Sequence, residues 1–456
     1  MEMTDPSWSG RWVAERLGIG LSGSPELPGL LGLAVRENPK RAHLLVSQVL
    51  GKHVPQRPEV VHQAGRRLGS LVRERLGAGA AGTVVLGYAE TATGLGHCVA
   101  DLLDAPYLHS TRREVATVAR AGGFAEEHSH ATGHLLLPAD PGLLAGTGPL
   151  VLVDDELSTG RTVLNTITEL HRQYPRQRYV LASLVDLRGP QDRARLVEFA
   201  AELGAEVEAV ALAEGLVRLP PGTLERAQRL VAATAAATVT AAPVAVVRGL
   251  GGGLVRAELD WPAGLPDGGR HGFHPAQRVR LEGTLDALGQ RLAGALRGGE
   301  RRVLVLGFEE LMYVPLRLAG ALAERLGAAV DVRYSTTTRS PVLAVDDPGY
   351  AIRTRLAFPA HDDPRDGGSP TRYAYNVAPG TDPSRRFDAI VLLVDTPADT
   401  PELHAPDGLL ARLREVTDLV VLGVVPSYSP PPPPSPELAG TPRTDDSRNP
   451  GSSVSV

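Results

Sequence analysis

Residues 149–162 read PLVLVDDELSTGRT and join three features that together suit the binding of a phosphate group. An apolar run ends at two adjacent carboxylates, Asp154 and Asp155, and a turn of small residues then leads into a helical pattern. The backbone N–H groups of this turn, from Glu156 to Thr162, can point at one anion at the positive end of the helix dipole. Gly160 permits a positive φ or a close approach of the backbone to a ligand. We therefore predict a phosphate cradle here.

The side chains of the same stretch indicate what else the ligand carries. Ser158, Thr159 and Thr162 add hydroxyl donors without blocking entry. Asp154 and Asp155 would repel a phosphate placed beside them, so they must face a different part of the ligand. Ribose hydroxyls, bound directly or through Mg²⁺, suit such carboxylates. The pattern predicts a sugar whose 5-phosphate lies at the turn and whose diol lies at the acids.

The elements around this stretch predict an α/β fold with a parallel sheet. LVLV (150–153) and YVLASLVD (179–186) read as strands, and Val163, Ile167, Leu170 and Tyr174 recur at helical spacing between them. TVVLG (83–87) is another apolar strand, followed by a loop and a short helical stretch. Strand, loop, helix and strand in this order indicate crossover units, in which loops at the carboxyl ends of the strands bind ligands.

Composition sets the outer limits. The chain has 456 residues, 43% of them hydrophobic, which is enough for two or three domains. A formal net charge of -5 does not favour binding to nucleic acid or to a membrane surface. Cys98 is the single cysteine, which excludes an internal disulfide and fits a reducing compartment. The first ten residues lack a signal-peptide pattern and Pro243 interrupts the longest uncharged stretch, so we expect a soluble cytoplasmic protein.

The second half of the chain repeats the plan of the first half. Three pairs of segments match in the same order: VVLGYAE (84–90) with VLVLGFEE (303–310), HSTRR (109–113) with TTTRSP (336–341), and LVLVDD (150–155) with IVLLVDT (390–396). The turn is not repeated, because DDELSTGRT becomes DTPADTPEL, without the glycine and without the second acid. We predict two related α/β lobes, of which only the first keeps the cradle.

The motif closely resembles the one with which type I phosphoribosyltransferases bind phosphoribosyl pyrophosphate (PRPP). This resemblance implies that Asp154 and Asp155 act at the ribose and its Mg²⁺, and that Arg112 and Arg113 neutralise the departing pyrophosphate. The turn residues that it implies for PRPP are Glu156, Leu157, Ser158, Thr159, Gly160, Arg161 and Thr162. It further implies a pyrophosphate loop at Ala89, Glu90, Thr91 and Ala92, and a mobile loop that includes Glu127, His128, Ser129 and His130. Glu156 and Ser158 depart from the family pattern, which leaves the base specificity open.

VDDELSTGRT, EEHSHATGH and TTTRSP together resemble bacterial phosphoribosyltransferases that are fused to a TRSP domain and encoded beside tellurium-resistance and stress-response genes. The resemblance implies a role in making or modifying a nucleoside-like metabolite, with PRPP and an unidentified base-like or other nucleophilic acceptor as substrates. Thr338, Arg339 and Ser340 would form the site of the second lobe. We expect an N-terminal extension (1–29), the transferase domain (30–240), the TRSP domain (250–426) and a disordered tail (427–456).

Several alternatives stay open. The intact loops favour an enzyme over a PRPP sensor without catalysis, and a homodimer is one option for the assembly. His128, His130 and His134 suit solvated or phosphate-binding roles better than a zinc site. Arg339 fits a structural ion pair as well as a ligand contact, and Arg270 and His271 could reach the site from the domain junction. The basic residues of 36–52, Arg36, Lys40, Arg41 and Lys52, are interpreted mainly as a solvated helix face, with the binding of substrate phosphates as the lesser alternative.

Overall fold

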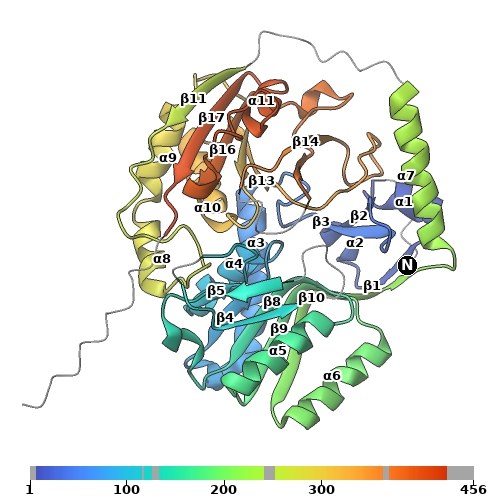
Figure 1. The fold of residues 1–456 in the computed structure, drawn as a ribbon, viewed down its shortest axis with the longest axis vertical. Coiled ribbons are helices and arrows are strands. Elements are labelled where there is room, and N and C mark those ends of the chain that lie inside the picture. Colours follow the sequence, from blue (N-terminus) through green and yellow to red (C-terminus); the bar gives the residue numbers. More distant parts are fainter. Residues whose placement is uncertain (1–6, 116–117, 126–132, 241–251, 363–368, 429–456) are drawn as a thin grey trace, which may run out of the picture.

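The computed structural model describes residues 7–428 except 116–117, 126–132, 241–251 and 363–368. It contains two sheets, one in each half of the chain, with helices between them and outside them (Figure 1). Both sheets are built mainly from parallel strands, as predicted. Within the described residues, no helix combines the length and the apolar character needed to cross a membrane.

The first sheet has six strands in the order β1-β10-β9-β8-β4-β5. Its strands are β1 (Gly20–Gly23), β4 (Val84–Gly87), β5 (Tyr107–His109), β8 (Leu150–Leu157), β9 (Arg178–Asp186) and β10 (Glu206–Arg218). All neighbours are parallel except β1, which pairs antiparallel with β10. Residues before 30, which we expected to form an extension, therefore contribute a strand to the first sheet.

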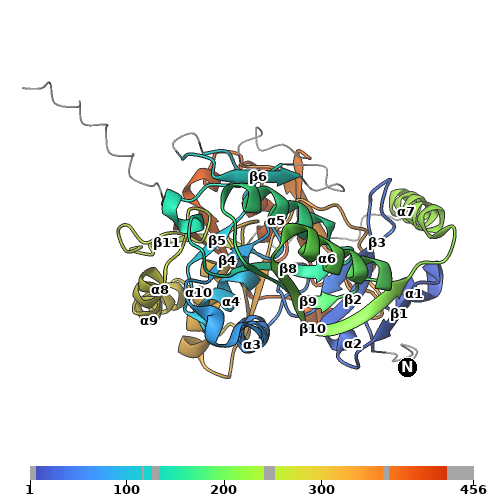
Figure 2. The same cartoon turned by 90° about the horizontal axis from the view of Figure 1, so that it is seen from below.

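Helices cover both faces of this sheet. The helices of the first half are α1 (Arg11–Leu17), α2 (Leu27–Leu30), α3 (Pro58–Leu76), α4 (Thr93–Leu103), α5 (Arg161–Gln173), α6 (Pro190–Leu203) and α7 (Thr223–Thr240). Figure 2 shows α5 and α6 side by side on one side of the sheet. Val163, Ile167 and Leu170 of α5 are buried, which confirms the predicted apolar face.

Two antiparallel hairpins complete the first half. They are formed by β2 (Leu31–Val35) with β3 (His43–Ser47), and by β6 (Gly122–Ala125) with β7 (Gly133–Leu136). The expected helix face across 36–52 is wrong, because this segment contains β3 and turns. The short apolar run LLV in β3, buried together with Ser47, suits a strand that pairs with β2.

The second sheet has five strands in the order β11-β17-β16-β12-β13, all parallel. Its strands are β11 (Gly253–Ala257), β12 (Arg302–Gly307), β13 (Asp331–Thr336), β16 (Ala389–Asp395) and β17 (Leu419–Val425). The helices of this half are α8 (Pro275–Glu282), α9 (Leu285–Gly294), α10 (Tyr313–Leu326) and α11 (Leu409–Arg414). A hairpin of β14 (Arg355–Pro359) and β15 (Thr371–Tyr375) lies beside it.

The strand orders show that the two lobes are related. β9-β8-β4-β5 in the first sheet corresponds to β17-β16-β12-β13 in the second, in the same chain order. The strand next to this set differs, because β10 follows its neighbour in the chain whereas β11 precedes all the others. The strand register also corrects the predicted alignment: Leu150 lies opposite Val84 and Ile390 opposite Leu304, so Asp395 corresponds to Asp155 and not to Asp154.

One hydrophobic core runs through both lobes. Val61 and Leu68 of α3, Val99 of α4, and Leu318 and Leu322 of α10 are buried in the same cluster. These three helices lie between the sheets (Figure 1). Removing either lobe would therefore expose apolar surface of the other lobe to water. Separate clusters cover the outer face of each sheet.

Candidate functional site

The predicted cradle lies where β8 passes into α5. Gly160 has φ 76° and ψ 0°, the left-handed conformation that glycine adopts most readily. α5 begins at Arg161 with Gly160, which has no capping side chain, at the N-cap, so the positive end of the helix dipole faces the turn. The Thr159 hydroxyl lies 3.4 Å from the Arg161 nitrogen. The turn therefore combines the backbone form and the hydroxyl groups that an anion site requires.

The three acids of the motif lie within the last residues of β8 and are half-buried. Asp154 Oδ1 accepts a hydrogen bond of 3.0 Å from the Asp155 N–H. Burial raises the pKa of Asp155, although the charge of Lys52 opposes the rise. Burial and the neighbouring Asp155 raise the pKa of Glu156 to about 8. A cationic or hydroxyl-bearing ligand would reduce the electrostatic repulsion among these three carboxylates.

Lys52 contacts the candidate pyrophosphate loop, which lies between β4 and α4. Its side chain is 8% exposed, and Nζ lies 2.9 Å from the Thr91 hydroxyl and 3.3 Å from Glu90. The Ala89 N–H donates to the Ser110 hydroxyl at 3.0 Å, which joins this loop to the segment after β5. We had expected Lys52 on a solvated face, and this interpretation is wrong. The lysine instead brings a buried positive charge to the loop.

Glu90 is almost fully buried, and nearby positive charges favour its ionised form. Burial alone would raise the pKa of Glu90, but the positive charges of Lys52, Arg339 and Arg112 hold it below its ordinary value. Thr338 Oγ1 donates to Glu90 at 3.1 Å, and Arg339 Nε lies 3.5 Å from it. Two of these partners belong to the second half of the chain, so the lobes meet at the candidate pyrophosphate loop.

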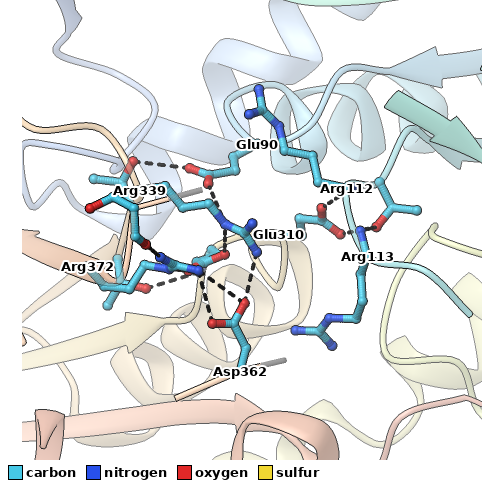
Figure 3. Close-up of polar contacts among 12 residues, drawn as sticks. Glu90, Arg112, Arg113, Glu310, Arg339, Asp362 and Arg372 are labelled. Atoms are coloured by element: carbon cyan, nitrogen blue, oxygen red, sulfur yellow. Dashed lines mark hydrogen bonds and ion pairs between the residues drawn. The ribbon is translucent and has the colours of Figure 1, made fainter. Parts of the chain in front are cut away.

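Arg112 and Arg113 point in opposite directions from the segment after β5 (Figure 3). Arg113 forms an ion pair with Asp395, at the end of β16 in the second lobe. In this structure Arg113 therefore pairs with the second lobe, and its predicted role at the leaving group stays a prediction. The Arg112 N–H donates to Glu310 at 2.9 Å, so the second lobe also holds the backbone of this segment.

Arg339 lies in a buried ion cluster at the carboxyl ends of the second-lobe strands. Its guanidinium contacts Glu309, contacts Asp362 at 2.9 Å and reaches Glu90, and Arg372 also pairs with Glu309 and Asp362 (Figure 3). The adjacent Ser340 hydroxyl accepts a hydrogen bond of 3.3 Å from Arg36. Of the two roles left open for Arg339, this arrangement favours the structural ion pair.

Matches to family models divide the chain in the same way as the two sheets. Residues 30–216 match the phosphoribosyl transferase family, and residues 267–413 match the TRSP domain that stands C-terminal to it. The chain belongs to the family that fuses these two domains. The resemblance seen in the sequence is thereby confirmed.

Solved adenine phosphoribosyltransferases are similar to this protein. The protein from Rhodothermus marinus is 21% identical, with 40% of this chain and 96% of that chain covered and a TM-score of 0.29. The protein from Trypanosoma brucei, in complex with AMP, pyrophosphate and ribose-5-phosphate, is 14% identical, with 40% and 76% covered and a TM-score of 0.31. No curated protein matches the chain.

The hairpin of β6 and β7 flanks the predicted mobile loop of the transferase domain. Glu127, His128, Ser129 and His130 lie outside the described residues. His134 in β7 is buried, and its Nδ1 lies 2.8 Å from the Ser110 hydroxyl. Among the described residues, no group of three or more histidines, cysteines or acids is arranged to hold a metal ion.

Arg270 reaches the cluster between the domains, which we had left open. It lies 3.3 Å from Glu310, 3.5 Å from Asp267 and 3.8 Å from Asp395. His271 instead contacts the backbone oxygen of Leu137 at 2.8 Å.

The TRSP domain supplies site residues that the sequence interpretation missed, chiefly Glu310 and Asp395. The repeat offered a signal for both, because Glu310 corresponds to Glu90 and Asp395 corresponds to Asp155. The second lobe lacks the cradle but keeps these two acids. Their presence could have indicated that they contact the first lobe.

Proposed function

We propose that the protein is a Mg²⁺-dependent phosphoribosyltransferase that uses PRPP. The observation that carries the proposal is the β8–α5 junction, where two carboxylates precede a glycine of positive φ at the N-terminus of a helix. The 5-phosphate would bind at residues 158–162, and Asp154 and Asp155 would bind the ribose hydroxyls. The match of residues 30–216 to the transferase family supports the same assignment.

Asp154 and Asp155 also fit a magnesium site. Mg²⁺ commonly takes one or two protein carboxylates and completes its shell with water and substrate phosphates, so it does not need a cage of three protein ligands. When bound with PRPP, Mg²⁺ would supply positive charge to the pyrophosphate. The half-buried position of the two acids at the strand end leaves them within reach of such a complex.

Other residues of the transferase domain would bind the pyrophosphate, neutralise its charge and exclude water. Residues 89–92 would hold the pyrophosphate, and Arg112 and Lys52 would place positive charge near the bond that breaks. Residues 127–130 would close over the substrates and exclude water. The bond from C1 of the ribose to pyrophosphate breaks through an oxocarbenium-like state, and a new bond forms from C1 to the acceptor.

The acceptor is a base-like molecule or another nucleophile. Arg36, between β2 and β3, donates to Ser340 of the TRSP domain, so both domains stand near the acids of the motif. We also propose a cytoplasmic location from the sequence, and a role in stress response or tellurium resistance from the family resemblance. A homodimer likewise remains one option for the assembly.

A PRPP sensor without catalysis is the second candidate function. Its supporting observation is the ion pair of Arg113 with Asp395. This pair directs the Arg113 side chain away from Arg112, although both were expected to neutralise the leaving group. The two functions differ in turnover, since a sensor would bind PRPP without releasing pyrophosphate when acceptors are supplied.

Calorimetry of PRPP binding, with and without Mg²⁺, tests the proposal. Asp154→Asn combined with Asp155→Asn should abolish most of the Mg²⁺-dependent affinity while the protein stays folded. Glu198→Gln with Glu202→Gln, two exposed acids of α6, is the matched control and should bind as the wild type does. Unchanged affinity in the folded double aspartate variant would refute the site. Labelled PRPP incubated with cell metabolites then distinguishes transfer from sensing.

A further inference from the structure

The loops that join the two domains are related residue by residue. The Ser110 N–H donates to Gly87 at 2.9 Å, and the Thr337 N–H donates to Gly307 at 3.1 Å. The Ala89 N–H donates to the Ser110 hydroxyl at 3.0 Å, and the Glu309 N–H donates to the Thr337 hydroxyl at 3.2 Å. These equivalent bonds align the loops after β4 and β12, and the segments after β5 and β13.

This alignment pairs Glu90 with Glu310 and Thr111 with Thr338, and these four residues exchange contacts across the domains. Thr111 Oγ1 donates to Glu310 at 2.6 Å, while Thr338 Oγ1 donates to Glu90 at 3.1 Å. Such reciprocal contacts define a two-fold interface between subunits of a symmetric dimer. Here both halves of the interface belong to one chain.

Nearby positive charges favour the ionised form of both acceptor carboxylates. Burial opposes ionisation of Glu310, but Arg270, His109 and Arg113 hold its pKa far below the ordinary value. Lys52 and Arg339 act in the same sense on Glu90. Hydrogen bonds to ionised groups are stronger than those between neutral groups, so each Thr–Glu contact can hold its loop in place.

The pseudo-symmetry is broken where chemistry would occur. After β16 the chain forms a short 3-10 helix, Thr396–Ala398, instead of a glycine turn leading into a long helix. Arg113 of the transferase domain corresponds to Ser340 of the TRSP domain. Only the transferase domain therefore retains a cradle, whereas the TRSP domain retains the contacts that a neighbouring subunit would make.

We propose that the TRSP domain is a built-in partner subunit that positions the pyrophosphate-binding loops of the transferase domain. Thr338 and Glu310 are the positioning residues: Thr338 orients Glu90 in the first loop, and Glu310 orients Thr111 and the Arg112 backbone in the second. This inference rests on the proposed function, because it assigns PRPP to that same site.

Calorimetric titration of the full chain with PRPP and Mg²⁺ tests the inference. Thr338→Val removes the hydroxyl at nearly constant volume and should weaken PRPP binding about tenfold or more, the cost of losing a hydrogen bond to a charged group. Thr338→Ser keeps the hydroxyl and should restore affinity. Thr417→Val is the matched control: it removes a buried hydroxyl that donates to Phe387 in the same domain, and should lower thermal stability without changing PRPP affinity.

Glu310→Gln provides a second measurement if Thr338→Val fails to fold, and should weaken PRPP binding by a similar factor. Wild-type affinity in either folded variant, alongside a wild type that binds PRPP, would overturn the inference and leave the proposed function intact. A wild type that does not bind PRPP would overturn the proposed function, and with it the inference.

Discussion

Arg339→Ala should destabilise the protein and also weaken PRPP binding. The Arg339 side chain is 11% exposed and contacts Glu309, Asp362 and Glu90. Removing one partner of a buried ion pair costs about 3–5 kcal/mol, because the remaining charge stays buried without compensation. Arg372 still serves Glu309 and Asp362, so we expect the lower end, about 3 kcal/mol in the free energy of unfolding. PRPP affinity should fall because Glu90 loses a cation that fixes it in the pyrophosphate loop.

Urea unfolding and PRPP calorimetry measure the two effects. Arg325→Ala is the control, since Arg325 and Asp286 are 45% and 89% exposed and 3.9 Å apart, and such a pair contributes less than about 1 kcal/mol. Arg339→Lys keeps the charge but not the fork of donors, and should lie between the wild type and the alanine variant. A loss below about 1 kcal/mol for Arg339→Ala, or unchanged PRPP affinity in the folded variant, would refute this account of the cluster.

Two further predictions concern the motif itself. Gly160→Val should block the phosphate cradle, because a β-branched residue resists the observed φ of 76°, and near-normal PRPP binding by calorimetry would show that the turn is not the cradle. The raised pKa of Glu156, about 8 against an ordinary 4.5, means that the folded protein holds a proton which the unfolded chain releases, so stability should fall as pH rises from about 4.5 to about 8. Glu156→Gln should flatten that slope in urea unfolding measured across the same pH range, and an unchanged slope would contradict the assignment.

The contacts of Arg339 show that the two domains do not act independently, contrary to what the sequence repeat had suggested. From the repeat alone, a second-lobe arginine would serve its own ligand and leave the first lobe unaffected. Instead, Arg339 and Thr338 reach Glu90 in the transferase domain, 248 residues away from Thr338 in the chain. Substitutions of Thr338 or Arg339 should therefore alter PRPP binding directly.

The sequence by itself determined the features that depend on neighbouring residues. Apolar runs and helical spacing predicted β8, α5 and β9, and the repeat predicted a second lobe without the turn. Gly160 was recognised as a residue that permits a positive φ or a close approach to a ligand, and the structure shows the positive φ. Local steric preference and the alternation of buried positions are encoded within a few residues, so they can be read without knowledge of the fold.

Only the tertiary structure decided how charges pair between the domains. Arg113 and Asp395 lie 282 residues apart, and no periodicity marks them as partners. Lys52 was likewise predicted to lie on a solvated face. It is buried instead, because β3 and the following turns place it against Glu90 and Thr91. Such pairings depend on how two sheets and their shared helices pack, since a buried charge takes whichever opposite charge the packed fold brings within reach.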